Sequence, residues 1–284
     1  MRVSNSLLRD RCPLCGAGSI TLVGPLAYRG QIEFSSGMIE LEYVPELWFC
    51  GQCTSRFVQH AVTEEAARQL YADGRAGERW SAEKFSEAKT PEAVNVMTQL
   101  FKQGGHVLDV GCNTGELLDY ARDLGCETAG VELSAESRSV LEFKRHKSYA
   151  SLDDVSGTYE LITAFDLFEH LYDVRGFLAA CRSRLASGGK LAILTGNVGS
   201  VSARVAGINW WYAQYPEHIV FPSKKFFAEF SGFRLDAWLP TYASRGYKLP
   251  VYRAAVSMLK SAVRRRPYTG LPSLGADHAL VVLT

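Results

Sequence analysis

Short apolar runs alternate with stretches of helical period through residues 104–200 of this chain. The runs predict strands at 107–110, 127–132, near 148–152, 159–165 and 190–195. The stretches between them predict helices at 116–124, from 134 onward and at 175–185. This alternation is typical of a doubly wound α/β fold, a parallel Rossmann-like sheet with helices on both faces.

The last sixty residues are predicted to complete that sheet. A helix at 224–230 is followed by strand patterns at 233–239 and 279–284, which would give seven strands with one antiparallel edge. Between these two strands, residues 249–266 predict a basic amphipathic helix. It could contact a nucleotide diphosphate, an anionic membrane surface or RNA. Most basic clusters are solvated faces, and that is the default expectation.

The pattern before residue 104 differs from the rest. Residues 1–60 contain short alternating segments that predict small antiparallel strands, and residues 61–103 predict two helices beginning near Thr63 and Thr90. We therefore expect a small N-terminal domain at 1–60, a helical linker or lid at 61–103 and the α/β domain at 104–284. In the linker, Tyr71, Arg75 and Trp80 could fold over a ligand or only pack on the main domain.

The composition is that of an ordinary globular protein. Of the 284 residues, 47% are hydrophobic and 21% charged, and the net charge is +1, so no global field draws the chain to nucleic acid or an anionic membrane. The N-terminal residues carry charges where a secretory signal needs an apolar run, and no apolar stretch is long enough to span a bilayer. Together with cysteines at metal spacing, this predicts a cytoplasmic, reducing location.

Four of the seven cysteines form two C-x-x-C pairs: Cys12, Cys15, Cys50 and Cys53. Two such knuckles on short antiparallel strands are typical of a zinc ribbon. Four thiolates close a tetrahedral coordination sphere, so the predicted zinc is structural and leaves no open position for chemistry. The alternative is two chance pairs in a reduced protein.

A strand, a glycine turn and a helix follow one another at residues 106–124, an arrangement that brings backbone N–H groups against a ligand. A dinucleotide fingerprint is disfavoured, because Glu116 stands where a pyrophosphate would lie and two negative groups repel. A zwitterion with a cationic sulfonium suits the loop better. Glu132, at the end of the next strand, is placed to accept both ribose hydroxyls.

These residues resemble motif I and the acidic residue of the class I S-adenosylmethionine-dependent methyltransferases. Residues 165–173 and 185–190 resemble later motifs of the same superfamily. The resemblance implies S-adenosylmethionine as cofactor. By position, it implies that the cofactor contacts Asp109, Gly111, Cys112, Asn113, Gly115, Glu132, Leu133, Ser151, Leu152, Phe165 and Asp166. The superfamily counterpart of His170 is usually a buried structural residue, which makes a catalytic role for it the less favoured interpretation.

Residues 209–223 are rich in aromatics, contain two prolines and have no clean period, so they predict a loop over the strand ends. Methyl transfer requires an aligned nucleophile, exclusion of water and removal of a proton. His218 is the histidine of this loop and is the candidate base, with Glu217 to orient it and Tyr215 to hold a substrate oxygen. Alternatively, His218 only pins the loop to the core. Trp210 and Trp211 could stack on a ring or fill the apolar side of the loop.

Tyr215-x-Glu217-His218 is similar to the motif of zinc-ribbon-bearing sugar C-methyltransferases, in which the histidine removes the proton beside a keto group. That family carries a further large C-terminal domain, for which this chain has no room. The resemblance implies a small-molecule acceptor, a sugar or sugar nucleotide, methylated at carbon or oxygen. The runner-up is an RNA methyltransferase whose ribbon binds nucleic acid, but the few basic residues in 10–60 argue against phosphate contacts. A third alternative is a scaffold with a vestigial cofactor fold.

Overall fold

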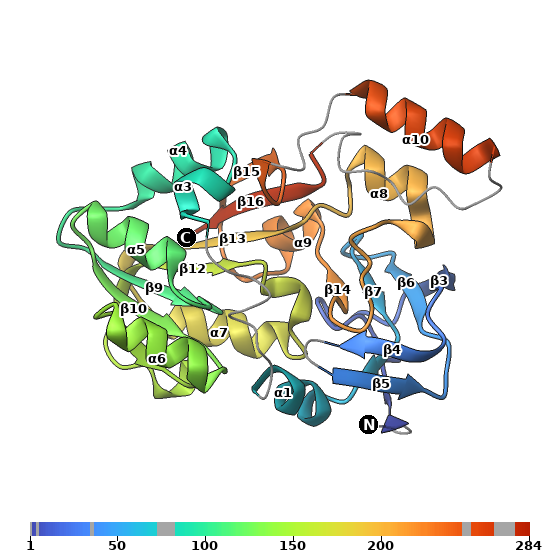
Figure 1. The fold of residues 1–284 in the computed structure, drawn as a ribbon, viewed down its shortest axis with the longest axis horizontal. Coiled ribbons are helices and arrows are strands. Elements are labelled where there is room, and N and C mark those ends of the chain that lie inside the picture. The colour runs from blue at the N-terminus through green and yellow to red at the C-terminus, as the bar shows by residue number, and fades with distance from the viewer. Residues whose placement is uncertain (1, 4–5, 35–36, 73–82, 246–250, 264–275) are drawn as a thin grey trace.

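A seven-stranded sheet forms the centre of the computed structural model, which describes all residues except 1, 4–5, 35–36, 73–82, 246–250 and 264–275 (Figure 1). The strands run in the order β11-β10-β9-β12-β13-β16-β15. Their bounds are β9 His106–Val110, β10 Glu127–Val131, β11 Lys147–Tyr149, β12 Tyr159–Phe165, β13 Leu185–Gly196, β15 Leu235–Thr241 and β16 His278–Leu283. The first five strands in this order pair in parallel, which confirms the predicted Rossmann-like sheet.

The sequence predicted one antiparallel strand at the edge of the sheet, and this position is wrong. β16 runs antiparallel to both β13 and β15 and lies between them, so β15 is the edge strand. The reason is burial. All six residues of β16 are buried, whereas β15 is mostly half-buried or exposed, so the more apolar strand takes the inner place.

Helices cover both faces of the sheet. On one face lie α3 (Phe85–Ala88), α4 (Pro91–Leu100), α5 (Glu116–Asp123) and α6 (Ala135–Phe143), whose side chains share a core with alternate strand residues. On the other lie α7 (Val174–Arg184) and α9 (Lys224–Glu229). Hydroxyl caps begin α4, α6 and α9, where Thr90, Ser134 and Ser223 each accept a hydrogen bond from the backbone N–H three residues on.

The N-terminal residues build smaller sheets beside the main one. The two-stranded sheet pairs β2 (Ser6–Leu8) with β8 (His60–Val62), and the three-stranded sheet contains β1 (Arg2–Val3), β5 (Gly37–Leu41) and β4 (Gly30–Phe34). A four-stranded sheet contains β14 (Val220–Phe221), β7 (Arg56–Val58), β6 (Glu46–Cys50) and β3 (Ile20–Pro25). β14 comes from the C-terminal half, so this sheet joins the cysteine-bearing segment to the loop that contains His218.

Three further helices connect these parts: α1 (Glu64–Ala72), α8 (Val201–Ala206) and α10 (Val251–Val263). Arg75, Trp80 and the arginines 264–266 lie outside the described residues. Tyr71 is described, and it contacts His170 rather than the glycine turn. Among the helices described, none combines the length and the apolar character needed to cross a membrane.

Candidate active site

The four motif cysteines come together in one cluster. Their Sγ atoms all lie within 4.8 Å of one another, with Cys12–Cys53 at 3.7 Å and Cys15–Cys50 at 3.5 Å. A tetrahedron with Zn–S bonds of about 2.3 Å has S–S edges of about 3.8 Å, so the cluster could hold zinc. The two C-x-x-C knuckles have the same turn geometry. The backbone N–H of Gly16 donates to the backbone oxygen of Cys12, and the backbone N–H of Thr54 donates to the backbone oxygen of Cys50. Gly16 and Thr54 both adopt positive φ there.

The glycine turn lies at the carboxyl end of β9. Gly111, Asn113 and Gly115 all have positive φ, so the loop needs residues that tolerate the left-handed region. A Cβ on Gly115 would lie 2.6 Å from Leu141 Cδ2, which shows how closely the turn packs on α6. Gly115 is also the N-cap of α5 and supplies no side-chain cap, so the first amides of that helix face the carboxyl edge of the sheet.

Glu132 follows β10 and braces the glycine turn. Its half-buried carboxylate accepts hydrogen bonds from the backbone N–H of Asn113 (3.0 Å) and of Ser134 (2.9 Å). Each carboxylate oxygen retains a further lone pair, so the group can still accept hydroxyl donors. Glu116 points back to the start of its own helix, where the Thr114 hydroxyl donates to it.

Asp109 is a buried carboxyl in the middle of the sheet. The hydroxyl of Thr163 donates to its Oδ1 at 2.6 Å. Burial raises the pKa of Asp109 to about 7, with Glu116 and Glu132 adding to the rise and Thr163 and Lys89 opposing it. This carboxyl group therefore gives up its proton at a much higher pH than an exposed aspartic acid does.

We expect Asp109→Asn to gain stability relative to the wild-type protein as pH rises. The folded-state pKa lies above the ordinary value of 3.8, so wild-type stability is complete below that value and is lost as pH rises through about 7. Asparagine retains an acceptor for Thr163 and does not ionise. Urea unfolding at about pH 5 and about pH 8 measures the difference in the free energy of unfolding between the variant and the wild-type protein. If this difference in the free energy of unfolding does not change with pH, the pKa of Asp109 is not raised in the folded protein.

The other predicted cofactor residues lie along the same edge. Cys112 is buried and Leu133 is 41% exposed. Ser151 caps a short 3₁₀ turn that begins at Leu152, and both are half-buried. Phe165 ends β12, and the exposed Asp166 accepts a hydrogen bond from Lys89 Nζ at 2.8 Å. The carboxyl ends of four neighbouring strands, β9 to β12, thus bring together every residue predicted to contact the cofactor.

His218 is buried beside this edge, with 8% of its surface exposed. Its Nδ1 lies 2.7 Å from the backbone oxygen of Tyr212. A carbonyl only accepts, so Nδ1 carries the proton and the neutral ring keeps its lone pair on Nε2. Burial, together with His170, lowers the pKa of His218 to about 3, while Glu217 and Asp166 oppose the change. His218 is therefore a neutral base throughout the physiological range.

Two neighbours of His218 were not predicted from the sequence as site residues: Glu169 and Tyr212. Glu169 is buried and accepts hydrogen bonds from Thr195 Oγ1 (2.9 Å) and from the Tyr212 hydroxyl. The ligand atoms of Glu169, His170 and His218 lie within 4.8 Å of one another, close enough for a metal. Because Thr195 and the Tyr212 hydroxyl hold Glu169, and backbone oxygens of Glu217 and Tyr212 hold the two histidines, we interpret the group as a hydrogen-bonded cluster.

Tyr215 and Glu217 extend the site toward the N-terminal sheets. The Tyr215 hydroxyl lies 2.6 Å from that of Tyr43, and the Tyr28 ring packs on Tyr215 at 5.9 Å. The backbone oxygen of Glu217 accepts from His170 Nδ1 at 2.9 Å. Tyr28 and Tyr43 come from the N-terminal segment, which thus forms a wall against Tyr215 in the loop that contains His218.

The two tryptophans of the loop fill the interior. Trp210 is buried and packs against Tyr212 and Phe221. The indole N–H of Trp211 donates to Asp277 at 2.6 Å. These contacts favour packing over stacking on a substrate.

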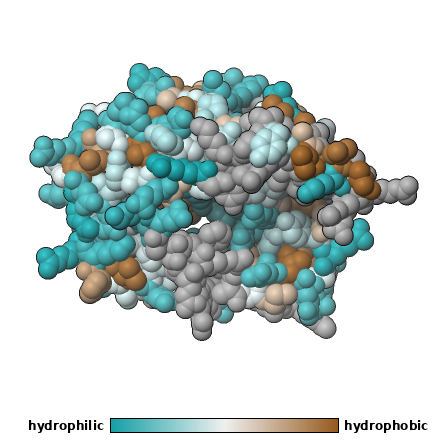
Figure 2. Space-filling view, turned by 45° about the horizontal axis from the view of Figure 1, so that its top comes forward, coloured by the Kyte–Doolittle hydropathy of each residue, from teal (hydrophilic) through white to brown (hydrophobic). Residues whose placement is uncertain are grey.

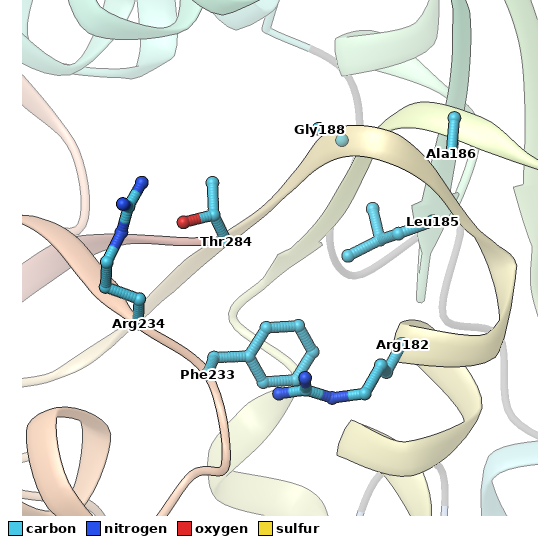
Figure 3. Close-up of a pocket in the computed structure, with 8 residues that line it drawn as sticks. Arg182, Leu185, Ala186, Gly188, Phe233, Arg234 and Thr284 are labelled. Carbon is cyan, nitrogen blue, oxygen red and sulfur yellow. The ribbon is translucent and has the colours of Figure 1, made fainter.

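A separate pocket of about 470 Å³ lies at the opposite end of the sheet. Figure 3 shows Arg182, Phe233, Arg234 and Thr284 around it. It adjoins the start of β13 and the end of the antiparallel β16, whereas ligands of open α/β sheets bind at the carboxyl ends of the parallel strands. This pocket is therefore not the candidate active site.

A family model described as a methyltransferase domain matches residues 82–230, slightly more than half of the chain. The chain belongs to this methyltransferase family. The match spans β9 to β14 and ends at the residue after α9, so it contains both the glycine turn and His218.

Curated relatives of this chain are similar to it over part of their length. A ubiquinone biosynthesis O-methyltransferase of Nitrobacter winogradskyi is 32% identical over 103 residues, which cover 33% of this chain and 40% of that protein. Its namesake from Xanthomonas euvesicatoria pv. vesicatoria is 30% identical over 113 residues, 36% of this chain and 47% of that protein. The chain thus matches less than half the length of these curated relatives.

Solved structures share the fold of this chain. A SAM-dependent methyltransferase from Archaeoglobus fulgidus aligns with a TM-score of 0.50 at 20% identity, covering 73% of this chain and 96% of the other. A methyltransferase in complex with the Trm112 methyltransferase activator from Haloferax volcanii aligns with a TM-score of 0.53 at 15% identity, covering 76% and 96%. At these identities the likeness concerns the fold alone.

Proposed function

We propose that this protein transfers a methyl group from S-adenosylmethionine to a small molecule, a keto sugar or sugar nucleotide, with His218 as general base. The observation that carries this proposal is the pairing of two features at one sheet edge. A glycine turn braced by Glu132 lies at the same edge of the sheet as a buried neutral histidine with its lone pair on Nε2. S-adenosylmethionine supplies an activated methyl group on a sulfonium, so the protein needs only to align the acceptor and remove its proton.

The donor side is argued from the chemistry of its groups. The positive-φ glycines let the backbone approach a ligand closely, and Glu116 in the first turn of α5 suits a donor that carries a cationic sulfonium. Glu132 suits ribose hydroxyls. Phe165 and Lys89 form a pair at the end of β12, with Lys89 Nζ 5.9 Å from the ring centre. These residues would hold and orient the cofactor.

We expect Glu132→Gln to weaken S-adenosylmethionine binding by about tenfold to a hundredfold, because hydrogen bonds to a charged acceptor contribute about 1.5–3 kcal/mol. Titration calorimetry measures the dissociation constant. Glu116→Gln is the matched control, since that carboxylate accepts from the Thr114 hydroxyl within its own turn and should retain near wild-type affinity. Equal affinities for all three proteins would contradict the role of Glu132.

On the acceptor side, His218 would take the proton from the carbon beside the keto group. The electron pair left behind forms an enolate, and its carbon makes the new bond to the methyl group while the sulfonium bond pair returns to sulfur. The imidazolium that forms would be balanced by Glu169. One hydroxyl of the Tyr43–Tyr215 pair would donate to the enolate oxygen while the other donates within the pair, a role that the sequence assigned to Tyr215 alone.

The acceptor class is tested by incubating the protein with methyl-labelled cofactor and a panel of acceptors. Keto-deoxysugar nucleotides are expected to take up label at carbon. Phenols form a second arm, because the curated relatives are named as ubiquinone biosynthesis O-methyltransferases. RNA forms the third arm. If a phenol or RNA takes up the label and no sugar does, the acceptor is not a sugar and belongs to the labelled class.

We further propose that Cys12, Cys15, Cys50 and Cys53 hold one structural zinc, on the geometry of their sulfur atoms. The hydrogen bond between Cys12 and Cys53 lowers the pKa of the Cys53 thiol to about 5. The division into domains 1–60, 61–103 and 104–284 stays a prediction.

A further inference from the structure

α10 carries a continuous apolar stripe on its exposed face. Tyr252, Val256, Leu259 and Val263 are 64%, 45%, 67% and 75% exposed. Their spacing of four, three and four residues places them along one side of the helix. Figure 1 shows α10 at the outer margin of the molecule, and Figure 2 shows hydrophobic atoms gathered on that side. Single exposed apolar residues are ordinary, but an aligned set of four indicates an interaction surface.

The segment that contains α10 is strongly basic. Residues 237–276 include seven Lys or Arg and no Asp or Glu, whereas the remainder of the chain has 24 basic and 30 acidic residues. Lys260 is exposed and lies beside the stripe, one position after Leu259. Arginines 264–266 follow the helix in sequence and lie outside the described residues. The excess positive charge of the chain is thus concentrated in the sequence that contains and flanks α10.

We propose that α10 docks this protein on an anionic phospholipid surface, with the apolar stripe in the headgroup layer and Lys260 against lipid phosphates. An interfacial helix of this kind combines an apolar face with Lys or Arg, and lies in the plane of the membrane without crossing it. Each basic residue near an anionic leaflet adds to the attraction. The default expectation of a solvated basic face does not account for four exposed apolar side chains.

Two other partners fit the observations less well. A second copy of the chain would bring two segments of charge +7 together, and like charges repel across an interface. RNA would suit the basic residues, but nucleic-acid surfaces use polar and stacking side chains, and the stripe has one aromatic and three aliphatic members. An anionic lipid surface matches both the charge and the apolar stripe.

The test is flotation of the full chain with phosphatidylglycerol vesicles and with phosphatidylcholine vesicles. We expect binding to the anionic vesicles that weakens with salt. The double variant Leu259→Glu with Val263→Glu should lose it, because both side chains are exposed and contribute little to the core. Lys260→Gln should reduce affinity about fivefold. Phe143→Glu is the matched control, since Phe143 ends α6 and is 88% exposed.

Three results would overturn the proposal. One is the absence of vesicle binding, and another is binding that the double variant retains. The third is an oligomer or an RNA complex that the double variant disrupts while the wild-type protein ignores both kinds of vesicle. None of these readouts requires methyl transfer, so the docking proposal can fail while the proposed function stands.

Discussion

Replacing His218 by alanine is expected to lower methyl transfer by about a hundredfold or more, the contribution of a positioned general base. The affinity for S-adenosylmethionine should be retained, because the glycine turn and Glu132 hold their geometry through contacts of their own. The rate of single turnover with the acceptor found in the labelled panel measures the loss, and calorimetry measures cofactor binding. Wild-type turnover in this variant would refute the assignment.

His218→Asn separates the chemical role of His218 from the pinning of its loop. The asparagine amide can donate to the backbone oxygen of Tyr212 as Nδ1 does, but it cannot take a proton. We expect this variant to be as inactive as the alanine variant and nearly as stable as the wild-type protein. Recovery of turnover in His218→Asn would show that the residue only pins the loop. Because burial and His170 lower the pKa of His218 to about 3, kcat/KM should show no acidic limb from this residue above about pH 5.

Much of the fold follows from local pattern. The apolar run at 159–165 became β12 with the predicted bounds, and Ser134 caps α6 as its hydroxyl predicts. Such features depend on neighbours in the chain, so the sequence shows them. The placement of β16 depends on the relative burial of two strands across the sheet, and no local period records that comparison.

Some residues of the candidate site also have a local signal in the sequence, whereas others depend on contacts between distant parts of the chain. The turn from Gly111 to Gly115 and the acidic residue after β10 were predicted, because their spacing carries the signal. Glu169 was passed over because it sits in a short 3₁₀ turn with no period, although a carboxylate beside a histidine is a usable signal. Tyr43 and Tyr215 are 172 residues apart in the sequence, although their hydroxyls are in contact. The residues next to Tyr43 in the sequence do not indicate this partner.

Cys50→Ser is expected to remove the metal from the cysteine cluster and to lower the melting temperature by about 10 °C, because loss of a metal site ranks with the largest single-residue effects. Loss of the metal should also disturb the position of His218 in the candidate active site. β7 pairs with β14, which begins two residues after His218, and the Ser223 hydroxyl donates to the Cys53 backbone oxygen. Methyl transfer should therefore fall. Cofactor affinity should persist, since β9 to β12 pair among themselves.

Metal analysis, thermal unfolding and turnover together test this coupling. Cys126→Ser is the matched control: Cys126 is also buried, its Sγ donates to the Lys102 backbone oxygen at 3.3 Å, and serine keeps that donor outside the cluster. The control should keep its metal, its melting temperature and its rate. A Cys50→Ser protein that loses zinc yet turns over at the wild-type rate would separate the ribbon from catalysis. The β14 pairing would then stabilise the fold without positioning His218, and the wall formed by Tyr28 and Tyr43 would have no part in holding the acceptor.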